Sequence, residues 1–170
     1  TTVIRRVMSW YTKLHQTWEP QYSDGRKKPL YYLLGPPHDV ALLGHYESTC
    51  GGCDNVGSAK AVHDLTNNVA YWASPEVILC EGLLLSEDAK WTTELHQHHN
   101  IRCLFLDTPI DRCVSQVKSR RAEAGNDKPL SESNTRNRVK AIESAYTRLN
   151  RNGVHCENVN VQQAVKSIRE

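Results

Sequence analysis

One short loop, rich in glycine and acidic residues, is the segment of this sequence best suited to chemistry. It reads GHYESTCGGCDN and carries two carboxylates, Glu47 and Asp54, with the pair Gly51-Gly52 between them. A carboxylate can take the proton of an attacking hydroxyl, so Asp54 is the preferred general base and Glu47 the alternative. Two adjacent glycines let the backbone approach a ligand closely. The same residues also fit a plain Gly-Gly turn in which Asp54 caps a helix.

Aromatic and thiol side chains surround this loop. Tyr46, Tyr71 and Trp72 could stack on a nucleobase, or could belong to the core. Cys50 and Cys53 form a C-x-x-C pair. A structural zinc site needs two further ligands at suitable spacing. His38 and His45 are near in sequence, but no second C-x-x-C exists, so a pair of ordinary thiols is the favoured interpretation.

Strands that alternate with helices must position these residues. The continuously apolar runs at 76–82 and 101–107 are typical of strands that are covered on both faces. A β-hairpin is predicted at 30–46, around Gly-Pro-Pro. Further elements are expected as helices at 58–73, 86–100 (with Ser86 as N-cap), 108–121 and 135–153, a last strand at 154–160 and a last helix at 161–170. This order predicts one α/β domain over 1–170, with a parallel sheet flanked by helices.

The first element is predicted to be a helix, although a parallel α/β sheet normally begins with a strand. Apolar residues recur at helical spacing from Val3 to Trp18, and Glu19-Pro20 ends the pattern. The P-loop pattern G-x-x-x-x-G-K-[ST] would supply a strand and a phosphate loop in front, with Thr1 at the position of its hydroxyl. We therefore expect the chain to begin just after such a Gly-Lys, and the chain as given to be inactive. The alternative is that Thr1-Thr2 only starts a helix.

Three later stretches resemble the P-loop nucleoside and nucleotide kinases in order and spacing. They are VILCEG, LFLDTPIDRCVSQVKSRR and RVKAIESAYTRL, and the resemblance covers nearly the whole chain. It implies a three-layer P-loop NTPase-like fold that uses ATP and Mg²⁺, with Glu81 and Thr1 as the metal ligands. It further implies a lid-like segment at 118–134 and phosphate-binding residues, namely Thr1, Thr2, Lys118, Arg120 and Arg121. Without the resemblance, Glu81 fits a surface turn, and the cations fit a solvated helix end.

The segment 29–58 resembles the acceptor site of phage 5-hydroxymethyluracil DNA kinases, as an inserted hairpin and loop. The shared pattern is G.Y....GG.D, which falls here on Gly44, Tyr46, Gly51, Gly52 and Asp54. The resemblance implies transfer of the γ-phosphoryl group of ATP to the hydroxymethyl group of that base in DNA. It implies that Tyr46, Gly51, Gly52 and Asp54 bind the acceptor. A deoxynucleoside monophosphate or nucleoside kinase is the alternative, and a non-catalytic nucleotide-binding module is the second alternative.

Composition and charge fit such a protein. The chain has 170 residues, is 39% hydrophobic and 24% charged, and has no apolar run near the roughly 20 residues of a membrane span. Scattered cysteines favour a reducing cytoplasm, which would be the host's if the gene belongs to a phage. Residues 101–170 hold 13 Lys and Arg against 8 Asp and Glu. The cations predicted on the helix at 135–153 favour a polyanion such as DNA over a mononucleotide: Arg136, Arg138, Lys140, Arg148 and Arg151.

Overall fold

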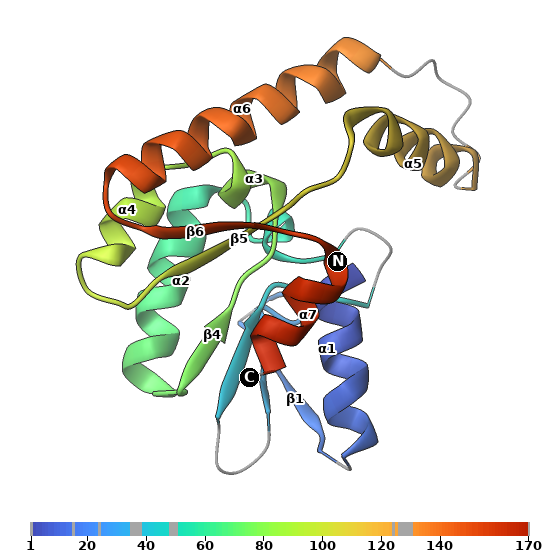
Figure 1. Cartoon of the computed structure of the whole chain (residues 1–170). Helices are drawn as coiled ribbons and strands as arrows, with labels where there is room; N and C mark the ends of the chain where they lie inside the picture. The colour runs from blue at the N-terminus through green and yellow to red at the C-terminus, as the bar shows by residue number, and fades with distance from the viewer. Residues whose placement is uncertain are drawn as a thin grey trace.

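The protein is a mixed α/β structure with helices on both sides of its strands (Figure 1). The computed structural model describes residues 2–14, 16–23, 25–34, 39–47, 51–123, 125 and 131–169. The elements in chain order are α1 (Thr2–Lys13), β1 (Trp18–Gln21), β2 (Tyr31–Leu34), β3 (Val40–Leu43), the 3-10 turn η1 (Cys53–Asn55), α2 (Ala59–Trp72), β4 (Val77–Leu79), α3 (Leu83–Ser86), α4 (Lys90–His96), β5 (Arg102–Leu106), α5 (Ile110–Glu123), α6 (Glu132–Arg151), β6 (His155–Val159) and α7 (Val161–Arg169).

The larger sheet has the strand order β1-β2-β3-β4. β1, β2 and β3 pair antiparallel, because short connections reverse the chain between them. β3 and β4 pair parallel, with Leu42 beside Leu79, because helix α2 carries the chain back between them. The predicted hairpin is confirmed, and its second strand is an inner strand of this sheet.

The smaller sheet contains β5 and β6, which pair parallel with Cys103 beside Cys156. The prediction of a parallel sheet is therefore confirmed only in part: β3–β4 and β5–β6 pair parallel, but the described strands form one mixed sheet and one separate parallel pair. β4 and β5 were also expected to be covered on both faces. Val77 and Leu106 are instead each 47% exposed, since one edge of each strand pairs with no described strand.

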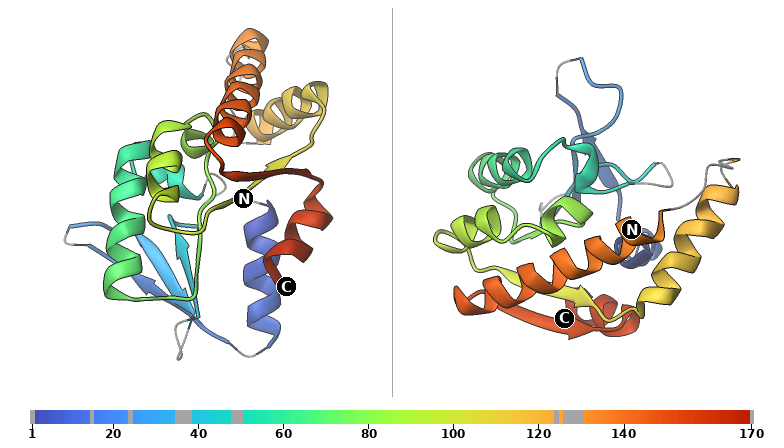
Figure 2. Two further views of the ribbon diagram at one scale, coloured as in Figure 1. Left: turned by 60° about the vertical axis from the view of Figure 1, so that its left-hand side comes forward. Right: turned by 90° about the horizontal axis from the view of Figure 1, so that it is seen from above.

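Helices cover both faces of both sheets, which gives three layers (Figure 2). Alternate residues of β2 and β3 face α2 on one side and α1 on the other, as Leu43 and Leu42 illustrate. The β5–β6 pair packs against α6 through Leu149 and against α1 and α7 through Val159. Among the described helices, none is long and apolar enough to cross a bilayer.

Two boundaries differ from the sequence prediction. α1 ends at Lys13, and Trp18 lies in the edge strand β1, where Pro20 is tolerated because its missing N–H costs little at an edge. The helix predicted at 86–100 is the shorter α4, and a separate short helix, α3, precedes it. Ser86 ends α3, and Asp88 caps α4 by accepting a hydrogen bond from the N–H of Trp91 at 2.8 Å.

Candidate functional site

The loop with the two carboxylates crosses the carboxyl ends of β3 and β4. Residues 44–47 leave β3, residues 51–54 return past them, and Glu81 follows β4 two residues after its end. The N–H of Gly52 donates to the carbonyl of His45 at 2.8 Å, and the N–H of Cys53 donates to the carbonyl of Glu81 at 2.6 Å. These two hydrogen bonds hold the loop against both strand ends.

Gly52 makes this crossing possible. Its φ is +89°, a conformation that side chains rarely adopt, and an added Cβ would lie 2.6 Å from the carbonyl oxygen of Glu81. A Cβ added at Gly51 would lie 2.5 Å from the carbonyl oxygen of His45. Both glycines are buried. The close approach expected from this pair is therefore made to the protein's own backbone. Whether it is also made to an acceptor stays a prediction.

Asp54 is exposed and lies beside the turn that follows Glu81. Its Oδ1 accepts a hydrogen bond from the N–H of Leu84 at 3.0 Å, in the first turn of α3. Gly82 leaves room for this carboxylate, since a Cβ there would lie 2.9 Å from the same oxygen. The structure thus brings together Asp54 and the segment of Glu81, which are 27 positions apart in sequence. Glu47 is also exposed and is the last described residue of the segment that follows β3.

Two buried polar side chains underlie the loop. His45 is 2% exposed and Tyr46 is 7% exposed. Both ring nitrogens of His45 and the hydroxyl of Tyr46 have no hydrogen-bond partner within the described structure. Burial, followed by the nearby thiol of Cys53, raises the pKa of Tyr46 above its ordinary value, so the phenol is neutral. Tyr46 packs against Ile4, Tyr32 and Leu42, and so belongs to the core beneath the loop.

A pair of thiols lies between the loop and β4. Cys53 is fully buried, and its Sγ lies 3.6 Å from the carbonyl oxygen of Leu43. Its hydrogen bond with Cys80, followed by burial, raises the pKa of Cys53. The same hydrogen bond lowers the pKa of Cys80, which is exposed and precedes Glu81. Thiolate character is therefore favoured at Cys80.

The basic residues predicted to close over phosphates lie in the second half of α5. Arg120 is exposed and Arg121 is half-buried. Lys118 forms an ion pair with Glu132 at the start of α6, with Nζ and Oε1 2.6 Å apart. The described part of 118–134 is mostly helical. Residues 124 and 126–130 lie outside the described residues, so the role of this segment as a lid stays a prediction.

Other predicted residues are separated from the loop or lie outside the described structure. Tyr71 and Trp72 end α2 just before β4 begins, at the edge of the sheet opposite Glu81, and are 76% and 80% exposed. Thr2 is exposed at the first position of α1, whereas Thr1, His38 and Cys50 lie outside the described residues. The described residues contain no group of three or more metal-ligating side chains.

The donors near the loop nevertheless suit Mg²⁺. This ion prefers oxygen ligands and is commonly held by one or two carboxylates, with water and substrate phosphates completing its shell. Glu81 carries such a carboxylate just after the end of β4, whereas Thr1, the other ligand predicted from the sequence, lies outside the described residues.

One comparison with known proteins covers the whole chain. The 5-hmdU DNA kinase of Pseudomonas phage PaMx11 is 30% identical over 174 aligned positions, which span 100% of this chain and 89% of that protein. The chain belongs to the family of this phage kinase. No family model and no solved structure matches it.

In this family member, the structure also contains a groove that the sequence did not reveal. Arg6, Trp10 and Arg169 line a groove between α1 and α7, the first and last helices of the chain. The sequence did contain a sign of this basic groove, because residues 2–13 and 161–169 contain no Asp or Glu. Periodicity alone, however, does not pair the first helix with the last.

Proposed function

We propose that this protein is an ATP-dependent phosphotransferase that acts on 5-hydroxymethyluracil in DNA. The hydroxymethyl oxygen of the base would attack the γ-phosphorus of ATP, lose its proton to a carboxylate, and leave ADP as the second product. The observation that carries this proposal is the relationship, over the full length of the chain, to a phage protein named for that DNA kinase activity. Its phage relative also supports a bacterial cytoplasm as the site of action.

The carboxylates of the loop supply the acceptor side of the proposed reaction. Asp54 is the preferred general base, because it is exposed and adjoins the segment of Glu81. Its hydrogen bond from Leu84 fixes one oxygen, and within the described residues the other oxygen is available to a hydroxyl. Glu47 is the alternative base, on the same side of the sheet.

Donor binding is assigned to Glu81, to Thr1 and Thr2, and to the cations of α5. Glu81 and Thr1 would hold Mg²⁺, which would neutralise charge on the phosphates. Lys118, Arg120 and Arg121 would contact the oxygens of the transferred group, where negative charge develops. Charge on α5 supports this, since two adjacent arginines lie in its last turn.

A P-loop arrangement is part of the proposal. It requires one further strand, followed by the phosphate loop, beside strands such as β4 and β5. Each of these strands has an edge that pairs with no described strand, which supports the arrangement. The codons upstream of Thr1 provide a direct test. A glycine-rich segment that ends in Gly-Lys fits the proposal, whereas any other sequence there removes Thr1 from the phosphate site.

The acceptor is tested with protein expressed from its complete gene, ATP labelled at the γ-phosphate, and two acceptors. One is duplex DNA that contains 5-hydroxymethyluracil, and the other is a panel of deoxynucleoside monophosphates and nucleosides. We expect label in the DNA and none in DNA that contains thymine instead. Label confined to the small acceptors would make the protein a nucleotide or nucleoside kinase. Nucleotide binding without transfer to any acceptor would make it a binding module.

A further inference from the structure

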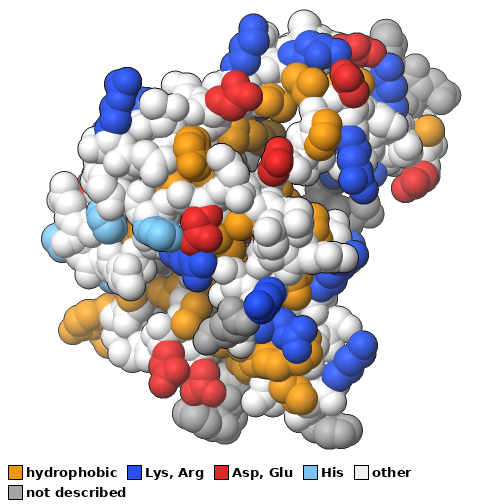
Figure 3. All heavy atoms as spheres, in the orientation of Figure 1, with side chains coloured by type: hydrophobic (Ala, Val, Ile, Leu, Met, Phe, Trp, Pro, Cys, Tyr) orange, Lys and Arg blue, Asp and Glu red, His pale blue; other side chains and the backbone are white. Residues whose placement is uncertain are grey.

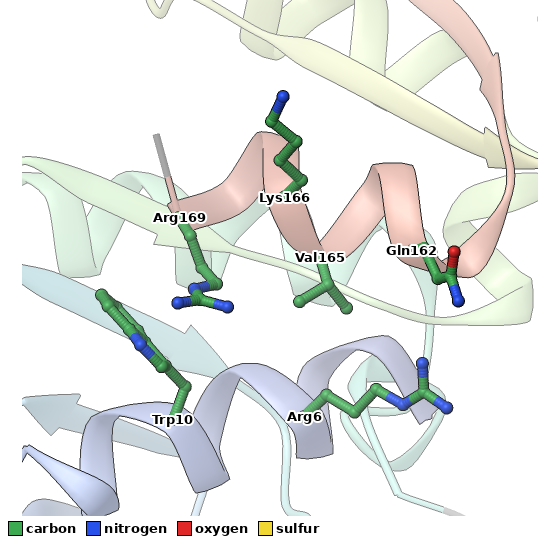
Figure 4. A pocket seen from close by; sticks show the side chains of 6 residues that line it. All are labelled: Arg6, Trp10, Gln162, Val165, Lys166 and Arg169. Atoms are coloured by element: carbon green, nitrogen blue, oxygen red, sulfur yellow. The ribbon is translucent and has the colours of Figure 1, made fainter.

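A groove between the first and last helices lies outside the loop site. Its volume is about 480 Å³, and its lining residues are Arg6, Trp10, Gln162, Val165, Lys166 and Arg169 (Figure 4). α1 and α7 lie side by side in all three ribbon views. α7 starts two residues after β6, and Val3 of α1 packs against Val159, so the end with Arg6 and Gln162 lies near the carboxyl end of β6.

The groove is electropositive because its two helices carry only positive charges. α1 contains Arg5, Arg6 and Lys13, α7 contains Lys166 and Arg169, and neither helix contains Asp or Glu. Glu170 follows α7 and lies outside the described residues. Figure 3 shows Lys and Arg side chains gathered over α1 and α7, with hydrophobic surface between them. The whole chain has a formal charge of only +2, so this concentration of charge is local.

Trp10 holds one of these cations in place. The guanidinium carbon of Arg169 lies 4.3 Å from the centre of the Trp10 ring. Stacking on an aromatic face fixes the plane of a guanidinium and leaves its N–H donors free to bind an oxyanion at the edge. Arg6 makes no hydrogen bond or ion pair with a described residue, and Figure 4 shows its guanidinium at the opposite end of the groove from Arg169.

The basic helix α6 is less available to a polyanion. Arg138 pairs with Glu87 at 2.6 Å, and Arg136 pairs with Asp111 at 3.2 Å. These ion pairs fasten α6 to the α3–α4 connection and to α5. The two cations at its far end, Arg148 and Arg151, are exposed and provide a matched comparison with the groove.

We propose that the α1–α7 groove binds the phosphodiester backbone of DNA. Arg6 and Arg169 would contact phosphates along one strand, with Lys166 at the rim, while Trp10 keeps Arg169 oriented. The choice of DNA as the polyanion rests on the proposed function. The groove would anchor the duplex beside the loop site and would not read its sequence, because phosphate contacts carry no base information.

Fluorescence anisotropy of a labelled duplex containing 5-hydroxymethyluracil tests the groove on the 170-residue chain. The groove variant carries both Arg6→Gln and Arg169→Gln. The α6 variant, its matched control, carries both Arg148→Gln and Arg151→Gln and so loses the same charge from α6. We expect the groove variant to bind the duplex at least about tenfold more weakly at low salt. A plot of the logarithm of the binding constant against the logarithm of the salt concentration should also have a slope flatter by about 2, since each phosphate contact contributes about 0.9. The α6 variant should bind like the wild type. The single variant Arg6→Gln, at an exposed position, replaces the groove variant if the double substitution impairs folding. Thermal midpoints show whether each variant is folded.

Three outcomes would overturn the groove as the DNA site. They are an equal loss of DNA affinity in both variants, no loss in either variant, and a loss confined to the α6 variant. The phosphorylation assay separates this from the proposed function. If the wild type binds DNA through the groove but transfers no phosphate to it, the groove stands and the proposed function fails. If DNA is phosphorylated and the groove variant keeps the wild-type KM for DNA, the function stands and the groove fails.

Discussion

The exposed carboxylate of Asp54 also makes a structural contact with the first turn of α3. One oxygen caps α3 through the N–H of Leu84, and the residue adjoins the segment of Glu81. Replacing the carboxylate by an amide keeps an oxygen for the cap and removes the basicity. The two roles can therefore be separated by a single substitution.

We expect Asp54→Asn to fold normally and to lower kcat by about 10²–10⁴-fold, the usual contribution of a general base. Steady-state kinetics of protein expressed from the complete gene, on DNA containing 5-hydroxymethyluracil, measures this, and the thermal midpoint serves as the folding control. Glu47→Gln is the matched substitution and should change kcat much less. If Glu47→Gln causes the large loss and Asp54→Asn does not, Glu47 is the base.

Thiol reactivity offers a second observable at the scale of single residues. Hydrogen bonding from Cys53 lowers the pKa of Cys80, whereas burial, followed by the neighbouring Cys156, raises the pKa of Cys103 to about 12. We expect iodoacetamide at neutral pH to alkylate Cys80 first among the five described cysteines and Cys103 far more slowly. Mass spectrometry of peptides over time measures the two rates. Because Cys80 adjoins Glu81, ATP with Mg²⁺ should slow its alkylation, and equal rates with and without nucleotide would separate Cys80 from the donor site.

At the scale of elements, α5 carries the residues that should distinguish transition state from ground state. Arg120 and Arg121 lie in the last turn of this helix, next to a segment that lies only partly within the described residues. We expect Arg120→Ala and Arg121→Ala to lower kcat much more than they raise KM for the acceptor, because charge develops on the phosphoryl group during transfer. Arg112→Ala, at an exposed position on the same helix, is the control and should leave both constants near wild type. An effect confined to KM would assign the two arginines to ground-state binding.

An ion pair across β5 and β6 makes a pH-dependent contribution to stability. Nε of Arg102 lies 2.7 Å from Oε1 of Glu157, and His155 approaches the same oxygen at 2.6 Å. Arg102, followed by His155, lowers the pKa of Glu157 from its ordinary 4.5 to about 2. A carboxyl group whose pKa is lowered on folding stabilises the fold at any pH above its ordinary pKa. This stabilisation is lost as the pH falls from 4.5 towards 2.

The thermal midpoint should therefore fall more steeply with acid in the wild type than in Glu157→Gln. The difference should be small, because the partners are partly exposed and solvent screens them. Midpoints measured across that acid window by circular dichroism provide the test. Identical acid profiles for the two proteins would contradict a stabilising role for this ion pair.

At the scale of the whole molecule, local patterns predicted the fold better than long-range pairings did. α2, the β2–β3 hairpin and α7 were all predicted, because periodicity and turn residues specify them within short windows. β1 was missed, since Pro20 ends a helix and also suits an edge strand, and its partner β2 lies beyond a loop. The division into two sheets depends on which strands meet in space, which no local pattern encodes.

The candidate site shows the same limits. The loop with Asp54 and the strand end at Glu81 were identified by residue type, and the structure brings them together. Burial of Tyr46 and the partnerless ring of His45 depend on tertiary packing and could not be read from the loop. The α1–α7 groove joins residues 6 and 169, and no sequence window contains both.

The 2.6 Å hydrogen bond from Cys53 N–H to Glu81 C=O makes the proposed donor and acceptor sides mechanically dependent. A ligand that shifts the strand end at Glu81 must also shift the loop of Asp54, and the reverse holds. Binding of ATP and of modified DNA should therefore be coupled, each ligand changing the affinity for the other by the same factor, as thermodynamic reciprocity demands. Calorimetric titrations of ATP with and without DNA, and of DNA with and without ATP, should give one common ratio of about fivefold or more. A ratio of one in both directions would mean that the two segments move independently despite their contact, and that the order in which substrates bind carries no energetic preference.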